Sequence, residues 1–247
     1  MQSAPLAPAD GLAVQADAEP VTRRGGAIAI AAAGIAFLLY PAIRPYGDET
    51  TLAGARGMAS ASWIAAHLSA IAGFILLTLG IQALYGVLRP TPAGKLAARA
   101  LLATWLGAGL TLPYYGVEVF GAHVIAQHAL DSHDAGALDM INDFRFNPAA
   151  VTLFAAGLLL LTVGTILAAT AIWRSTHLAR WSGIPLAAAF TLFIPQFFAT
   201  PSLRILHGAL TLTACLYLAT VLWPKKPGDV RAETAETAPG RGTQPLG

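Results

Sequence analysis

The stretch "SASWIAAHLSAIAGFILLTLGIQALYGVL", residues 60 to 88, contains no Asp, Glu, Lys or Arg. A helix needs about 20 mostly apolar residues to cross a bilayer, so this run is long enough to span a membrane with some tilt. Five further runs are largely apolar as well: residues 25–43, 98–126, 147–173, 181–199 and 202–223. The sequence therefore predicts an all-α, polytopic integral membrane bundle of six transmembrane helices.

The composition agrees with a membrane environment. Of 247 residues, 55% are hydrophobic and 11% are charged, whereas about 25% of the residues of an ordinary soluble domain are charged. The lipid bilayer is therefore the predicted partner of the apolar surface. The basic residues lie in short clusters beside apolar runs and do not form one continuous face, which argues against binding to nucleic acid.

The chain divides into three predicted parts. Residues 1–22 and 225–247 mix Ala, Pro, Asp and Glu without periodicity, so we expect disordered tails. The six-span transmembrane domain occupies residues 23–224.

The distribution of Lys and Arg predicts the orientation, because basic residues concentrate in short cytoplasmic loops. With the N-terminus inside, only Arg44, Arg56, Arg145 and Arg204 fall outside or near the outer surface. The other eleven basic residues then lie on the cytoplasmic side: Arg23, Arg24, Arg89, Lys95, Arg99, Arg174, Arg180, Lys225, Lys226, Arg231 and Arg241. We therefore expect a multi-pass protein of the cell inner (plasma) membrane with both termini in the cytoplasm.

A recurring motif suggests an internal repeat. The sequences "LLYP", "LTLP" and "LFIP" end at Pro41, Pro113 and Pro195, each toward the predicted outer end of an odd-numbered span. Three related helical hairpins would explain this recurrence.

The stretch "LTLPYYGVEVFGAHV", residues 110–124, places Glu118 inside an apolar run. His67, Glu118 and His207 each lie five to eight residues from the predicted outer end of a different span, which is a common depth of about 10 Å. Ionisable groups inside a membrane normally face the bundle interior. We therefore expect an outward-facing polar pocket in the outer leaflet, to which Tyr115, Gln196, Arg204 and Arg44 also contribute as ligand-binding residues.

Two functional interpretations of this pocket follow from its chemistry. His67, Glu118 and His207 are a ligand set suited to zinc or non-haem iron, so metal-assisted or acid/base catalysis by these three residues is one hypothesis. The substrate would be small or lipid-like, with Arg204 orienting an anionic group. The alternative is a proton-coupled transporter of small molecules or ions, or a ligand sensor, because His and a buried carboxyl can titrate near neutral pH.

Two further alternatives stay open. Glu118 and Arg204 could form a buried ion pair with a purely structural role. His67 and His207 could instead be the axial ligands of a single b-type haem. No phosphate-binding glycine loop, GxSxG or CxxC motif narrows the choice, and the sequence does not specify an oligomeric state.

Overall fold

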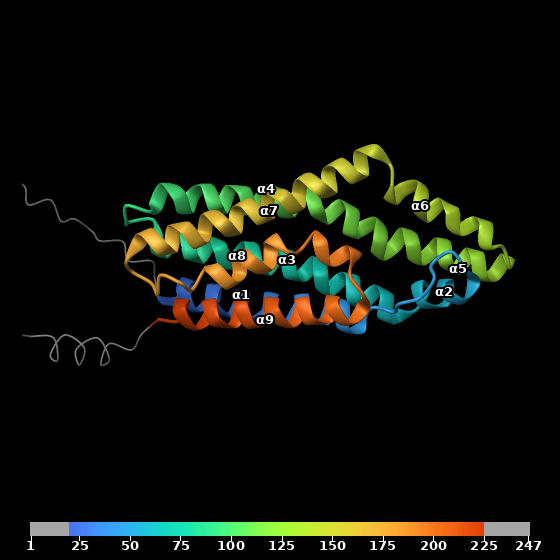
Figure 1. The fold of residues 1–247 in the computed structure, drawn as a ribbon, viewed down its shortest axis with the longest axis horizontal. Helices are drawn as coiled ribbons and strands as arrows, with labels where there is room; N and C mark the ends of the chain where they lie inside the picture. Colours follow the sequence, from blue (N-terminus) through green and yellow to red (C-terminus); the bar gives the residue numbers. More distant parts are fainter. Residues whose placement is uncertain (1–19, 225–247) are drawn as a thin grey trace, which may run out of the picture.

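Long antiparallel helices dominate the computed structural model, which describes residues 20–224 (Figure 1). Five of its helical segments are long and apolar enough to cross a membrane. They are α1 (Pro20–Ile43), α3 (Ala61–Leu88), α4 (Gly94–Gly116) with its continuation, α7 (Pro148–Ser175) and α9 (Pro201–Leu222). No strand is present in residues 20–224, so the predicted all-helical membrane bundle is confirmed.

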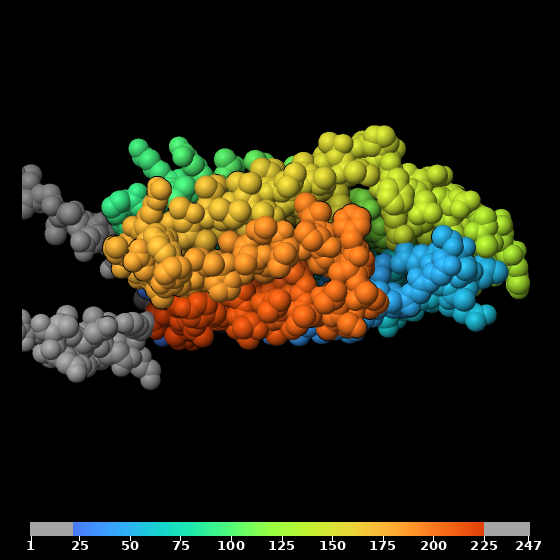
Figure 2. All heavy atoms as spheres, in the orientation of Figure 1, coloured from blue at the N-terminus to red at the C-terminus, as the bar shows by residue number. Residues whose placement is uncertain are grey.

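The predicted fifth span, residues 181–199, differs from the other five. It forms the short helix α8 (Ile184–Thr191), a turn, and the 3₁₀ helix η3 (Pro195–Phe198). Eight helical residues extend only about 12 Å, less than half of the ~30 Å hydrocarbon core. In Figure 2 this orange segment covers the face of the bundle between α7 and α9, and it packs against both helices.

Small residues let neighbouring helices approach closely. Helix α1 packs along α3, and α4 packs along α7. A Cβ atom on Gly107 of α4 would lie 2.7 Å from the backbone nitrogen of Leu161 and 2.8 Å from the carbonyl oxygen of Gly157, both on α7. Backbone contact of this kind is typical of membrane helix pairs, where small side chains stabilise packing.

Beyond the bundle, the chain folds into a small cap. Helix α4 continues through the π-helix η1 (Val117–Gly121) into α5 (Ala122–Ser132), giving an unbroken helical segment of 39 residues. Its length of about 58 Å exceeds the thickness of a bilayer. Helix α5 therefore projects past the long helices, where it packs with α2 (Leu52–Met58), η2 (Ala135–Leu138) and α6 (Asp139–Arg145) (Figures 1 and 2).

The cap, meaning α2, α5, η2 and α6, has its own apolar core. This core also includes Trp63 from the first turn of α3, which joins the cap to the bundle. Its buried members are Ala55, Met58, Trp63, Ala122, Ala126, Ala129, Leu138 and Ile141.

Capping residues define where the cap ends and the long helices begin. The Ser60 hydroxyl accepts a hydrogen bond from the Trp63 backbone nitrogen at 3.3 Å and starts α3. The Asn147 side chain accepts from the Ala149 nitrogen at 3.0 Å, and Pro148 follows at the first position of α7. Side chains that accept from free N–H groups, and proline at this position, both favour helix starts. Arg145 is the last residue of α6, just before α7.

Both ends of the described chain lie at the end of the bundle opposite the cap. The Arg23 side chain donates from Nε to the carbonyl oxygen of Leu222 at 2.7 Å, which joins the start of α1 to the end of α9. The predicted disordered tails lie outside the described residues, except that α1 already begins at Pro20.

Candidate functional site

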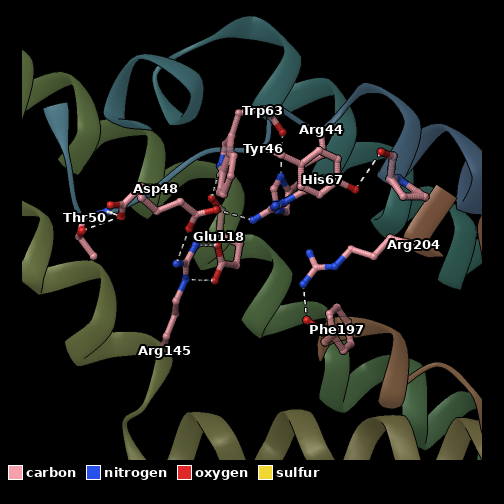
Figure 3. A network of polar contacts seen from close by, with 12 residues as sticks. Arg44, Tyr46, Asp48, Thr50, Trp63, His67, Glu118, Arg145, Phe197 and Arg204 are labelled. Carbon is pink, nitrogen blue, oxygen red and sulfur yellow. Dashed lines mark hydrogen bonds and ion pairs between the residues drawn. The ribbon is translucent and has the colours of Figure 1, made fainter. Parts of the chain in front are cut away.

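Four charged side chains of alternating sign connect the cap to the bundle (Figure 3). Both Glu118 carboxylate oxygens accept from Arg145, from Nε at 2.6 Å and from Nη2 at 2.7 Å. Glu49 accepts from the same arginine, Nη1 at 2.6 Å, and from Arg44 Nη2 at 2.6 Å. A bidentate arginine–carboxylate pair is among the strongest polar contacts in proteins. The chain of ion pairs therefore fixes the loop after α1, helix α6 and η1 relative to one another.

Glu118 reaches this network from a π-turn. Pro113 lies within α4 and cannot donate a backbone hydrogen bond, and the helix widens into η1 four residues later. The carbonyl oxygen of Glu118 accepts a hydrogen bond from Trp63 Nε1 at 2.7 Å. The structure therefore shows a π-turn shortly after the proline, and Glu118 lies within it.

The charges at the outer part of this network stabilise one another. Burial raises the pKa of Glu49, but the positive charges of Arg145 and Arg44 outweigh burial and hold that pKa below its ordinary value. Burial lowers the pKa of Arg145, and its bonds to Glu118 and Glu49 outweigh this and raise the pKa. Both Glu49 and Arg145 are therefore ionised at neutral pH.

We expect the contribution of Glu49 to stability to disappear in acid. A carboxyl whose pKa is lowered on folding stabilises the protein above its ordinary value of 4.5, and this stabilisation is lost as the pH falls through the lower, folded value. Glu49→Gln should therefore be less stable than the parent protein by about 1–3 kcal/mol at pH 7. Thermal unfolding in detergent should show this difference shrinking below pH 4.5. A difference that stays constant down to pH 3 (roughly one unit below Glu's unperturbed pKa) would contradict the ion-pair role of Glu49.

Beside this network lies a cavity of about 430 Å³, here called the junction cavity. Side chains from the long helices, the π-turn, η3 and the end of α6 line it. Its polar and tyrosine lining residues are Tyr40, Arg44, His67, Tyr114, Tyr115, Glu118, Arg145 and Arg204. Its other lining residues are Phe146, Val151, Phe154, Ala155, Leu158, Ile194, Phe197 and Phe198.

Three residues that line this cavity each carry a buried polar atom without a hydrogen-bond partner among residues 20–224: Arg44 Nε, Tyr115 Oη and Arg204 Nε. Arg204 donates from Nη2 to the carbonyl oxygen of Phe197. It forms no salt bridge within the described residues. The alternative ion pair of Glu118 with Arg204 does not form, and Glu118 pairs with Arg145 instead.

The junction cavity carries a surplus of positive charge. Three guanidinium groups line it, those of Arg44, Arg145 and Arg204, whereas only two carboxylates, those of Glu118 in the lining and of Glu49 behind it, pair with them. A partly buried cation without a compensating charge lowers stability, because desolvation is not repaid. An anion bound beside Arg204 would balance the charge.

His67 presents a defined face to the cavity. The residue is 2% exposed, and its Nδ1 lies 2.8 Å from the carbonyl oxygen of Trp63. A carbonyl oxygen only accepts, so in the neutral ring Nδ1 carries the hydrogen and Nε2 carries a lone pair. Tyr40 and Trp63 pack on the ring, with centroids at 5.3 and 4.2 Å. Nε2 has no hydrogen-bond partner in the described part of the chain.

The structure does not bring His207 into this site. Its Nε2 lies 2.8 Å from the carbonyl oxygen of Ala189, and the residue lines a separate groove between α8 and α9. Tyr115, Phe74 and Phe193 pack in succession from the ring of His67 to that of His207. The described residues hold no group of three His, Cys, Asp or Glu side chains placed to share a metal ion. The predicted zinc or iron ligands His67, Glu118 and His207 are thus not assembled, and a haem could not join the two histidines without displacing this aromatic layer.

The other predicted site residues have mixed outcomes. Gln196 is buried in η3 and does not line the junction cavity. Glu49 and Arg145, which complete the network, were missed because they lie in predicted loops. One feature of the sequence pointed to Arg145 as the partner of Glu118. A buried carboxylate needs a cation, and Arg145 is one of only four basic residues assigned to the outer side. Five predicted residues do line the cavity: Arg44, His67, Tyr115, Glu118 and Arg204.

Comparison with protein-family models, curated proteins and solved structures found no match to the chain. Function is therefore inferred from the junction cavity itself.

Proposed function

We propose that the protein is a multi-pass protein of the cell inner membrane that binds an anionic ligand in the junction cavity, on the non-cytoplasmic side, as a sensor or carrier. The observation that supports it is that the guanidinium of Arg204 has no carboxylate partner in the described residues and lines, with Arg44, a cavity beside which positive charges outnumber negative ones. Two donors without partners and a surplus of positive charge beside one cavity favour an anion.

The distribution of charge supports this orientation. Arg23, Arg89, Lys95 and Arg174 lie at the bundle end opposite the cap, where the positive-inside rule places the cytoplasm. The cap and the cavity entrance then face the exterior.

The same orientation places the site near the outer membrane boundary. Arg44, His67, Glu118 and Arg204 each lie about 20 helical residues from the opposite end, which is the length needed to cross the hydrocarbon core. A ligand at this level can be reached from the headgroup region.

The ligand-binding role can be tested by titrating butanoate and butyl phosphate into the purified protein in phosphatidylcholine nanodiscs. Arg204→Gln should weaken binding of the preferred anion about 10- to 100-fold, because a hydrogen bond to a charged group contributes about 1.5–3 kcal/mol. Isothermal titration calorimetry measures the affinity.

Arg56→Gln is the matched control, since Arg56 is an exposed arginine of α2 that does not line the cavity. It removes the same charge and should leave the affinity unchanged. Equal weakening by both substitutions, or no binding of either anion to the unmodified protein, would contradict the proposed function.

A second candidate, an acid/base membrane enzyme, is favoured by the free Nε2 of His67. Glu118 is a poor base because both of its oxygens already accept from Arg145. In such an enzyme the imidazole would accept a proton from the bound ligand. This candidate is favoured over a carrier if the unmodified protein converts the ligand to a product and the His67→Gln variant returns the ligand unaltered.

A further inference from the structure

We infer, building on the proposed anion site, that the ligand is an anionic amphiphile, and that it enters the junction cavity sideways from the lipid. The charged head would lie at Arg204 and Arg44, and the chain would lie between α7 and η3.

The apolar side of the cavity is its exposed side. Phe198 of η3 is 89% exposed, Phe146 before α7 is 73% exposed, and Val151 of α7 is 41% exposed, and all three line the cavity. No charged residue lines the cavity from α7 or η3. An exposed apolar opening of this kind is costly in water, but it matches the acyl-chain region of a bilayer.

The charged groups lie at the inner side of the same cavity. Arg44 and Arg204 each have a buried Nε without a partner, whereas Phe146 and Phe198 at the opening are exposed. The lining therefore changes from guanidinium groups to aromatic and aliphatic side chains across one continuous space. This order matches a molecule with a charged head and an apolar tail.

The short fifth span explains why the opening is there. Helix α8 ends at Thr191 and the chain turns into η3, so no full-length helix closes the face between α7 and α9 at this level. Phe154 of α7 and Phe197 of η3 pack across the gap with ring centroids 5.7 Å apart. Both rings line the cavity and would contact the chain of a bound amphiphile.

Ligands with alkyl chains of different length test this inference separately from the anion site. Butanoate and dodecanoate, and the two corresponding alkyl phosphates, are titrated into the protein in phosphatidylcholine nanodiscs, with each long-chain concentration expressed as a mole fraction of the bilayer. The rise in unfolding temperature reports binding. We expect the long chain to bind at least 10-fold more tightly than the short one, after correction for partitioning.

Ala155→Leu fills the apolar part of the cavity and should remove most of this preference. Val151→Trp narrows the opening at an exposed position and should do the same, which covers the case in which Ala155→Leu folds poorly. Leu159→Phe is the control, because Leu159 is 56% exposed on the same helix and does not line the cavity.

The outcomes distinguish the two proposals. If short and long anions bind equally in the unmodified protein, or if the preference survives both Ala155→Leu and Val151→Trp, the lipid-side entry is wrong while the anion site stands. If long chains bind irrespective of Arg204→Gln and of both cavity substitutions, binding is unspecific and the inference is also overturned. If no anion of either length binds, the proposed function itself fails.

Discussion

Replacing Arg145 by glutamine should destabilise the protein by about 3–5 kcal/mol, because it leaves a buried carboxylate without its cation. Arg145 donates two hydrogen bonds to Glu118 and one to Glu49, and the carboxylate side chain of Glu118 is only 9% exposed. Since this arginine also ends α6, the loss should loosen the cap before the bundle. Thermal unfolding in detergent and hydrogen exchange of α5 and α6 measure the two effects.

A double variant separates the charge from the packing. Glu118→Gln combined with Arg145→Gln removes both members of the buried pair and should recover part of the stability lost by Arg145→Gln alone. Arg56→Gln, on the exposed face of α2, should have little effect. If Arg145→Gln is as stable as Arg56→Gln, the ion-pair chain does not hold the cap on the bundle.

The main architecture could be predicted because it depends on composition alone. Runs of about 20 apolar residues without charge can form little except spanning helices. The interruption inside residues 181–199 could not be predicted in this way. A short helix, a turn and a 3₁₀ segment are as apolar as one continuous helix. The proline of "LFIP" indicates that a helix is interrupted nearby, but it does not indicate that α8 ends at Thr191.

The site was partly predictable because depth along a helix follows from residue counting. Counting placed His67, Glu118 and His207 at one level, and the first two of these line one cavity. Counting does not say which neighbour a given face meets. His207 therefore has a suitable depth but turns toward α8, where it contacts the carbonyl oxygen of Ala189.

The partner of Glu118 required knowledge of the cap. Glu49 and Arg145 are 96 residues apart in sequence, and Arg145 joins Glu49 to Glu118 because α2, α5 and α6 pack around a second apolar core. No local spacing rule connects these segments. The partner of a buried carboxylate is thus reasonably sought among the few charged residues in the predicted loops on the same side of the membrane.

Trp63→Ala should be the most damaging single substitution at an uncharged position of the site, with an expected cost of about 3–5 kcal/mol. The indole is fully buried, belongs to the cap core, packs on His67 with ring centroids at 4.2 Å, and lies under the guanidinium of Arg44 at 4.8 Å. Removing it should therefore lower the unfolding temperature and also weaken anion binding, because Arg44 and His67 lose the surface that positions them.

Trp63→Phe tests the polar part of this role. Phenylalanine keeps most of the ring packing but cannot donate the 2.7 Å hydrogen bond to the carbonyl oxygen of Glu118 in the π-turn. We expect a cost of about 1 kcal/mol from this bond alone, and a further effect on the affinity for the anion if the π-turn shifts. Trp181→Ala is the control, since that indole is 60% exposed at the opposite end of the bundle. If Trp63→Ala lowers the unfolding temperature no more than Trp181→Ala does, Trp63 does not join the cap to the bundle, and the position of Glu118 must depend on Arg145 alone.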